Sequence, residues 1–126
     1  IGVNKAGGII QMGSLGDKPG VGPMQLLLMA LAGCTGIDIV GILRKKRIDL
    51  VDLQVQVRGR RSQDYPMVWK EIEVIYKLWG NNLPSKDIEQ AIHLSEKKYC
   101  SVGSMLGKTA RITSRYELFT PDQIRK

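Results

Sequence analysis

The chain has 126 residues, 43% of them hydrophobic, which is the size and composition of one globular domain rather than of a disordered or low-complexity segment. Nineteen basic against twelve acidic residues give a formal net charge of +7, which favours solubility and acidic partners but says nothing about the fold. Two cysteines are too few for the disulfide scaffold of a small secreted module, so the cytoplasm is the expected compartment.

The first 22 residues are rich in glycine and begin with Ile1 rather than methionine, which leaves room for residues upstream of this sequence. They contain no charged segment followed by an apolar core, so no signal peptide is expected. One short run, residues 8–12, has the character of a strand. A loop dense in turn residues follows at positions 17–23.

The longest apolar segment, residues 24–43, predicts a helix that begins at Pro23 and ends with the basic residues 44–47. Its length would span a bilayer, but a charge such as Asp38 in mid-segment costs about 2.5–3.5 kcal/mol on insertion. A helix that is apolar on nearly all sides also fits the centre of a globular fold. We therefore predict a buried central helix and no membrane span.

Two strands with period-two alternation follow, at residues 51–58 and 68–79. The connection between them, residues 59–66, is polar and too short for a crossover helix, so antiparallel pairing is expected. The positions predicted to face the core are Val51, Leu53, Val55, Val57, Ile72, Val74, Tyr76 and Leu78.

The last third predicts a helix over residues 85–99, capped by Ser85 or a neighbour, a short helix from Ser101 to near Gly107, and a strand over residues 110–119. The order of elements indicates a single α+β domain, residues 1–126, with a largely antiparallel sheet packed on the long helix. The predicted apolar face of the first of these helices is Ile88, Ala91, Ile92, Ser95 and Tyr99.

The two cysteines are the candidate reactive residues, and their local settings differ. Cys34 lies about three turns past Pro23, beyond the reach of the helix dipole, and Asp38 one turn later would disfavour a thiolate. Local sequence alone therefore predicts an inert, buried thiol unless another segment or subunit activates it.

Cys100 precedes a predicted helix start, and Lys97 and Lys98 lie within the preceding turn. Both features stabilise a thiolate, although a partly exposed structural cysteine is an equal alternative. The separation of the two cysteines excludes a Cys-x-x-Cys motif. If the fold brings them together, the second thiol can trap the oxidised form of the first as a disulfide.

Other functional classes have little support. His93 is the only histidine and is predicted on a polar, solvated face, so neither a zinc site nor a Cys–His pair is indicated. The basic clusters at residues 44–47 and 58–61 could meet phosphates, but such clusters are typical of helix caps and solvated loops. A nucleic-acid partner is therefore not expected.

Two segments centred on the cysteines resemble the signatures of the OsmC/Ohr family, the osmotically inducible and organic-hydroperoxide-resistance proteins. They are Gly-Pro-Met-Gln-Leu-Leu-Leu-Met-Ala-Leu-Ala-Gly-Cys-Thr at residues 22–35 and Ala-Ile-His-Leu-Ser-Glu-Lys-Lys-Tyr-Cys-Ser-Val at residues 91–102. The resemblance covers about residues 20–119. It implies an α+β fold and an intertwined homodimer with active sites at the subunit interface.

The resemblance also implies a chemistry: a thiol-dependent peroxidase that reduces organic or hydrogen peroxides and protects against oxidative or osmotic stress. Cys34 takes the position of the cysteine that attacks the peroxide and becomes a sulfenic acid, and Cys100 that of the resolving cysteine. The implied partners are a second copy of the chain, the peroxide and an external dithiol reductant, with no bound cofactor or metal.

Two departures mark a divergent branch. The family's well-characterised peroxidases carry a glutamate ten residues before the first cysteine, where this chain has Met24, and an N-terminal arginine, whereas no arginine here precedes Arg44. Gln25, beside Met24, is the polar residue assigned an auxiliary role. The alternative function is a non-enzymatic dimeric module that binds a small hydrophobic molecule and has unreactive cysteines.

Overall fold

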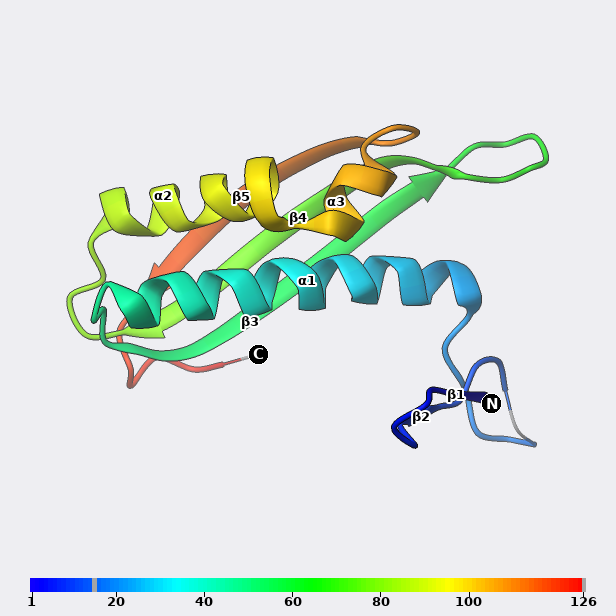
Figure 1. Cartoon of the computed structure of the whole chain (residues 1–126), viewed down its shortest axis with the longest axis horizontal. Coiled ribbons are helices and arrows are strands. Elements are labelled where there is room, and N and C mark those ends of the chain that lie inside the picture. Colours follow the sequence, from blue (N-terminus) through cyan, green and yellow to red (C-terminus); the bar gives the residue numbers. More distant parts are fainter. Residues whose placement is uncertain (15, 126) are drawn as a thin grey trace.

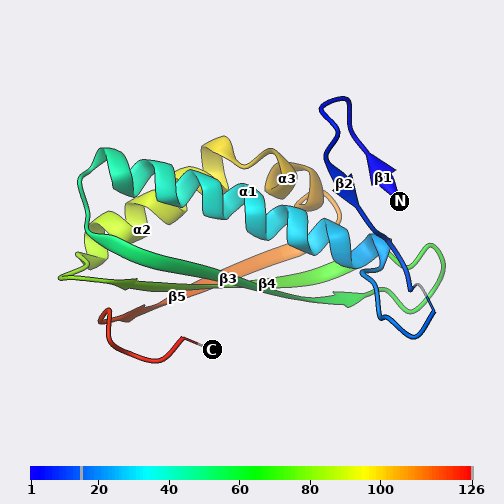
Figure 2. The same cartoon turned by 90° about the horizontal axis from the view of Figure 1, so that it is seen from below.

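A three-stranded sheet with all the longer helices on one face forms the body of the molecule (Figures 1 and 2). The computed structural model describes residues 1–14 and 16–125. In chain order the elements are β1 (Gly2–Val3), β2 (Ile9–Ile10), α1 (Pro23–Lys45), β3 (Leu50–Arg61), β4 (Trp69–Gly80), α2 (Ser85–Leu94), the π-helix η1 (Ser95–Tyr99), α3 (Ser101–Leu106) and β5 (Arg111–Phe119).

The sheet has the strand order β3-β4-β5. β3 and β4 pair antiparallel, as predicted, with Val55 opposite Tyr76. β5 runs parallel to β4, with Tyr116 opposite Tyr76, because the chain returns through α2, η1 and α3 before entering β5. The predicted α+β class is confirmed, and the sheet is mixed rather than antiparallel throughout.

The central strand β4 contributes more buried apolar residues to the core than any other described element. Its four predicted inward residues are all at most 1% exposed, and they face the layer of helices. The opposite face is covered at one end, where Trp79 stacks on Phe119 with ring centroids 4.9 Å apart. The indole nitrogen of Trp79 also donates a hydrogen bond to the Gln123 carbonyl oxygen at 3.1 Å, which holds the C-terminal tail against the sheet.

Val51 was predicted to face the core but is half exposed. It lies on the edge strand β3, where the pairing with β4 shifts register between Leu50 and Asp52. Such a bulge interrupts the two-residue alternation on which the prediction rested.

Within one chain, α1 is buried along a single stripe. The stripe recurs every four residues, as one face of a helix should, whereas Met29 and Ile37 are 57% and 77% exposed. The predicted burial on all sides is therefore not present in one chain. By length and composition α1 could also cross a membrane, yet in this fold it is the helix that covers the sheet. The buried stripe is Leu31, Thr35, Ile39 and Leu43.

The helix predicted over residues 85–99 divides into α2 and η1. A π-turn contains one more residue than an α-turn, so the residues after it are rotated relative to the predicted face. Ser95 remains fully buried, but Tyr99 is half exposed and not part of the apolar face.

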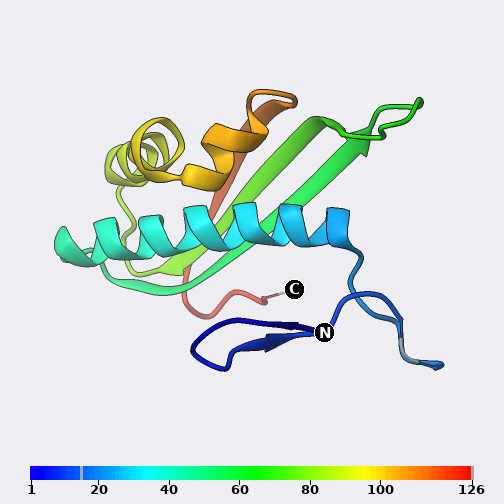
Figure 3. The ribbon, with the colours of Figure 1, turned by 45° about the vertical axis from the view of Figure 1, so that its right-hand side comes forward.

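The N-terminal hairpin of β1 and β2 lies apart from the sheet and helices (Figure 3). β2 covers part of the run that the sequence predicted as a strand. The hairpin and the loop that follows it expose five large apolar side chains: Ile1, Val3, Ile9, Ile10 and Met12.

Ile39 offers a direct test of the α1 stripe, because its side chain is 0% exposed. Ile39→Ala should lower the free energy of unfolding by about 2–5 kcal/mol, the usual cost of a cavity in a packed core. Urea denaturation measures this value. The control is Ile124→Ala, at a side chain 82% exposed, where the change should stay within about 0.5 kcal/mol; equal losses in the two variants would contradict the packing described.

Candidate active site

The fold brings the two cysteines side by side. Cys34 lies on α1 and is half-buried, and Cys100, 3% exposed, joins η1 to α3. Because α1 packs against both η1 and α3, the Cys34 thiol lies near enough to raise the pKa of the Cys100 thiol. Both are free thiols. The two cysteines are therefore neighbours within one chain.

Cys100 forms the N-cap of α3. The backbone N–H of Gly103 donates to the Cys100 Sγ at 3.2 Å. A side chain at position 103 would begin 3.4 Å from that sulfur and 3.5 Å from Leu31 on α1. Both are ordinary van der Waals distances, so α3, the cysteine and the central helix are closely packed around this position.

Cys100 is held in its protonated form. Burial, followed by the hydrogen bond with Cys34, raises the pKa of the Cys100 thiol to about 11, and the charge of Asp38 acts in the same direction. The Gly103 N–H opposes this shift without overcoming it. The predicted stabilisation of a Cys100 thiolate by its lysine neighbours is therefore wrong, because Lys97 and Lys98 extend into solvent while the sulfur is desolvated.

A cavity of about 340 Å³ opens beside Cys100, between α1, the sheet and the η1–α3 turn. This volume suffices for a small organic molecule. Its wall is apolar at Leu31, Val74 and Ile112. Glu96, Lys97 and Arg111 also border it, so its lining combines apolar and charged side chains.

A polar network that sequence reasoning missed lies next to the cavity. The hydroxyl of the fully buried Tyr76 donates to Glu96 Oε2 at 2.8 Å, and the Ser114 hydroxyl donates to Glu96 Oε1 at 3.1 Å. Burial and the adjacent carboxylate raise the pKa of Tyr76, so the phenol keeps its proton. Thr35, on α1, borders this cavity too. The sequence contained one indication of this network: Tyr76 was predicted to face the core, and a buried phenol needs a hydrogen-bond partner.

Asp38 has a partner that the sequence did not indicate. Its Oδ2 accepts a hydrogen bond from the Ser95 hydroxyl at 2.9 Å, and Ser95 is fully buried. This contact explains how a carboxylate is accommodated in the middle of the apolar helix α1. It also fixes a negative charge near Cys100.

Gln25 lies away from the cysteines. Its Oε1 accepts a hydrogen bond from the Gly22 backbone N–H at 2.8 Å, which is the glutamine half of a capping box at the start of α1. About two and a half turns of helix separate it from Cys34. Its placement gives Gln25 a local role in starting the helix.

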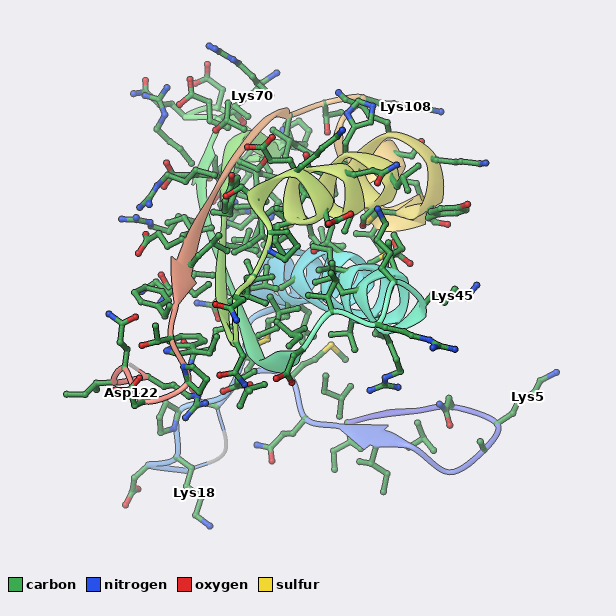
Figure 4. The ribbon with its side chains drawn as sticks, turned by 90° about the vertical axis from the view of Figure 1, so that its left-hand side faces the viewer. Lys5, Lys18, Lys45, Lys70, Lys108 and Asp122 are labelled. Atoms are coloured by element: carbon green, nitrogen blue, oxygen red, sulfur yellow. The ribbon has the colours of Figure 1, made fainter. Side chains whose placement is uncertain are left out.

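The remaining candidates carry no site. His93 is exposed, and the described residues contain no cluster of three or more His, Cys, Asp or Glu side chains that could hold a metal. In the basic cluster of residues 58–61, Arg58 and Arg60 pair with Glu73 and Glu71 across the sheet. Lysines are also spread over separate elements, as the labelled Lys5, Lys45, Lys70 and Lys108 show (Figure 4).

The raised pKa of Cys100 predicts its pH-dependent reactivity. Only the thiolate is alkylated, so the rate of iodoacetamide reaction at Cys100 should climb with pH, reach half its maximum near pH 11 and level off above that pH. Peptide mass spectrometry separates this reaction from that at Cys34. The urea-unfolded chain is the control and should reach half its maximum near the ordinary thiol pKa of about 8.5; a folded-state midpoint at or below the unfolded one would contradict the burial argument.

Comparisons with known proteins agree with this arrangement. The family model of OsmC-like proteins matches residues 16–115. Protein YhfA of Escherichia coli K12 is 39% identical over 110 residues, which cover 87% of this chain and 81% of YhfA. A crystal structure of a hypothetical protein from Aquifex aeolicus is 35% identical, with a TM-score of 0.76 over 80% of this chain and 76% of that one.

A more distant structure shows the same fold. The organic hydroperoxide resistance protein OhrB of Bacillus subtilis superimposes with a TM-score of 0.59, at 14% identity, over 81% of this chain and 74% of OhrB. The family match spans most of the chain and includes both cysteines. The chain therefore belongs to the OsmC-like protein family.

Proposed function

We propose that the protein is a thiol-dependent peroxidase that reduces organic or hydrogen peroxides through Cys34 and Cys100. The observation that carries this proposal is the pair of free thiols that two separate elements bring close together, with a cavity beside Cys100. Membership of the OsmC-like family supports it, as does the fold shared with a protein named for organic hydroperoxide resistance.

The reaction proceeds in three balanced steps. The Cys34 thiolate attacks the O–O bond of a peroxide ROOH, which leaves Cys34 as a sulfenic acid and releases the alcohol ROH. Cys100 then condenses with the sulfenic acid, so an S–S bond forms and water leaves. An external dithiol reduces this disulfide by exchange and restores both thiols.

The different settings of the two thiols suit this division of labour. Because burial keeps Cys100 protonated, it does not compete with Cys34 for the peroxide, since the thiolate is the nucleophile. The apolar wall of the cavity would hold the organic group of a hydroperoxide.

Replacement of each cysteine tests the assignment. Cys34→Ser should abolish peroxide consumption in the presence of dithiothreitol, measured by the loss of added cumene hydroperoxide. Cys100→Ser is the matched control: it should still form a Cys34 sulfenic acid that dimedone traps, but no intramolecular disulfide. Peroxide turnover that is unchanged in Cys34→Ser would remove Cys34 from the mechanism.

One observation favours the alternative function, a non-enzymatic module that binds a small hydrophobic molecule. The negative charge of Asp38 raises the pKa of the Cys100 thiol, and a second carboxylate, Glu96, borders the cavity beside that thiol. The same experiment separates the two functions. In a binding module, Cys34 would form neither a dimedone adduct nor a disulfide with stoichiometric peroxide.

We also propose that the protein works as a homodimer. Met29 and Ile37 on α1 are largely exposed, and a groove of about 830 Å³, with Gly33 and Val40 in its wall, runs between α1 and β3. An apolar face of this kind usually marks an interface. A second copy would cover it, and would also offer a surface to the exposed N-terminal hairpin.

Ile37→Asp should convert the dimer to a folded monomer, because it places a charge on the apolar face of α1 without disturbing the buried stripe. Sedimentation equilibrium gives the mass, and circular dichroism confirms the fold. Ile124→Asp, at another exposed isoleucine, is the control and should stay dimeric. A wild-type chain that sediments as a monomer would refute the proposal.

A further inference from the structure

We propose that Glu96 accepts the proton that Cys100 loses when it condenses with the oxidised Cys34. This inference rests on the proposed peroxidase function and assigns a residue to its second step. Neither the cysteine motifs nor the spacing of the two cysteines pointed to Glu96.

The position of Glu96 is the first argument. It borders the same cavity as Cys100, and no other residue described around that cavity carries a carboxylate. Tyr76 donates to one of its oxygens at 2.8 Å and Ser114 to the other at 3.1 Å, so the carboxylate is held in place. Each carboxylate oxygen has more than one lone pair, so both can still accept a further hydrogen bond from the cavity.

The π-helix sets this geometry. In η1 the Cys100 N–H bonds to the Ser95 carbonyl oxygen at 2.7 Å, five residues back. This turn leaves Glu96 beside the cavity and directs Cys100 inward as the N-cap of α3. Single π-turns are frequent at functional sites.

The chemistry of Cys100 supplies the need for a base. With a pKa near 11, about one molecule in ten thousand carries a Cys100 thiolate at pH 7. Condensation must nevertheless remove this proton while the hydroxyl leaves Cys34. In the proposed step, the Cys100 sulfur attacks the Cys34 sulfur while Glu96 takes the Cys100 proton, and the hydroxyl leaves Cys34 with the bonding electron pair as hydroxide. The proton then passes from Glu96 to the hydroxide, so the products are the disulfide and one water, and Glu96 is again a carboxylate.

Asp38 is the competing acceptor and fits less well. It acts on Cys100 through its charge, its Oδ2 already accepts from Ser95, and it does not border the cavity. The ionisable groups that act on Cys100 are Cys34 and Asp38 from α1 and Tyr76 from β4, and the charged groups that border the cavity beside it are Glu96, Lys97 and Arg111. The ionisable groups around Glu96 are Tyr76, Glu89, His93, Lys97, Arg111, Arg115 and Tyr116.

The test measures the condensation step alone. Reduced full-length protein is mixed with stoichiometric hydrogen peroxide, quenched with acid at successive times, and assayed by mass spectrometry for sulfenic acid and disulfide between pH 6 and pH 11. In the wild type, disulfide formation should vary little with pH between about 6 and 9. In Glu96→Gln it should be slower at pH 7 by about 100-fold or more and should rise about tenfold per pH unit, approaching the wild-type rate near pH 11.

Two variants control for structural effects. Glu96→Asp keeps a carboxylate and should keep the flat profile, even if its rate is lower. Asp38→Asn removes the other carboxylate and should not slow condensation at pH 7, because loss of a negative charge favours the Cys100 thiolate. A uniform slowing of Glu96→Gln at every pH, a wild-type rate, or the tenfold-per-unit profile in Asp38→Asn would each overturn the assignment.

Failure of the underlying function has a different signature. If the Cys100→Ser variant forms no Cys34 sulfenic acid with peroxide, the first step does not occur, and the peroxidase and this inference fall together. If the sulfenic acid forms and Glu96→Gln condenses like the wild type, only the role of Glu96 fails.

Discussion

The packing of α1 against the η1–α3 turn is the contact on which the rest of the molecule depends. The buried stripe of α1 anchors the helix to the sheet, and the same face carries Leu31 against Gly103, one turn before Cys34. A Cβ atom at position 103 would lie 3.4 Å from the Cys100 sulfur and 3.5 Å from Leu31, which are ordinary van der Waals distances, so helix and turn meet closely around this position. If α1 and the η1–α3 turn were not packed together, the Cys34 and Cys100 thiols would lie apart from one another.

Desolvation, rather than charge, controls the chemistry of this site. Local charge suggested a stabilised thiolate at Cys100, since two lysines precede it and a helix begins at it. The structure places those lysines in solvent and the sulfur in the interior, where loss of hydration outweighs the single backbone hydrogen bond from Gly103. A thiol that stays protonated until it is needed is suited to resolve an oxidised partner, and this is the basis for assigning a base to it.

The covered and uncovered faces of the chain suggest how it is used. The face of β4 toward the helices is buried within one chain, its other face is covered only in part, and α1 buries a single stripe. The other side of α1 is as apolar as the buried one, and exposing such a surface to water is energetically unfavourable. The apolar composition of α1 predicted a helix surrounded by protein. Within one chain, only the buried stripe of α1 has that environment.

The amino-acid sequence by itself determined the order and type of nearly every element. The alternation of residues 51–58 and 68–79 predicted two paired strands, and the inward residues of β4 followed from it because side chains alternate across a strand. The two cysteine motifs predicted the family and named both thiols. These features depend on residues that are close together in the chain, so they can be recognised in the amino-acid sequence.

Only the tertiary structure decided the parallel pairing of β5, the half exposure of Tyr99, the high pKa of Cys100 and the network of Tyr76, Glu96 and Ser114. Each of these depends on residues far apart in the chain, or on a π-turn that changes the helical period without a visible mark in the sequence. Burial is likewise a property of the whole packed chain, so the ionisation of a thiol within it could not be read from its neighbours.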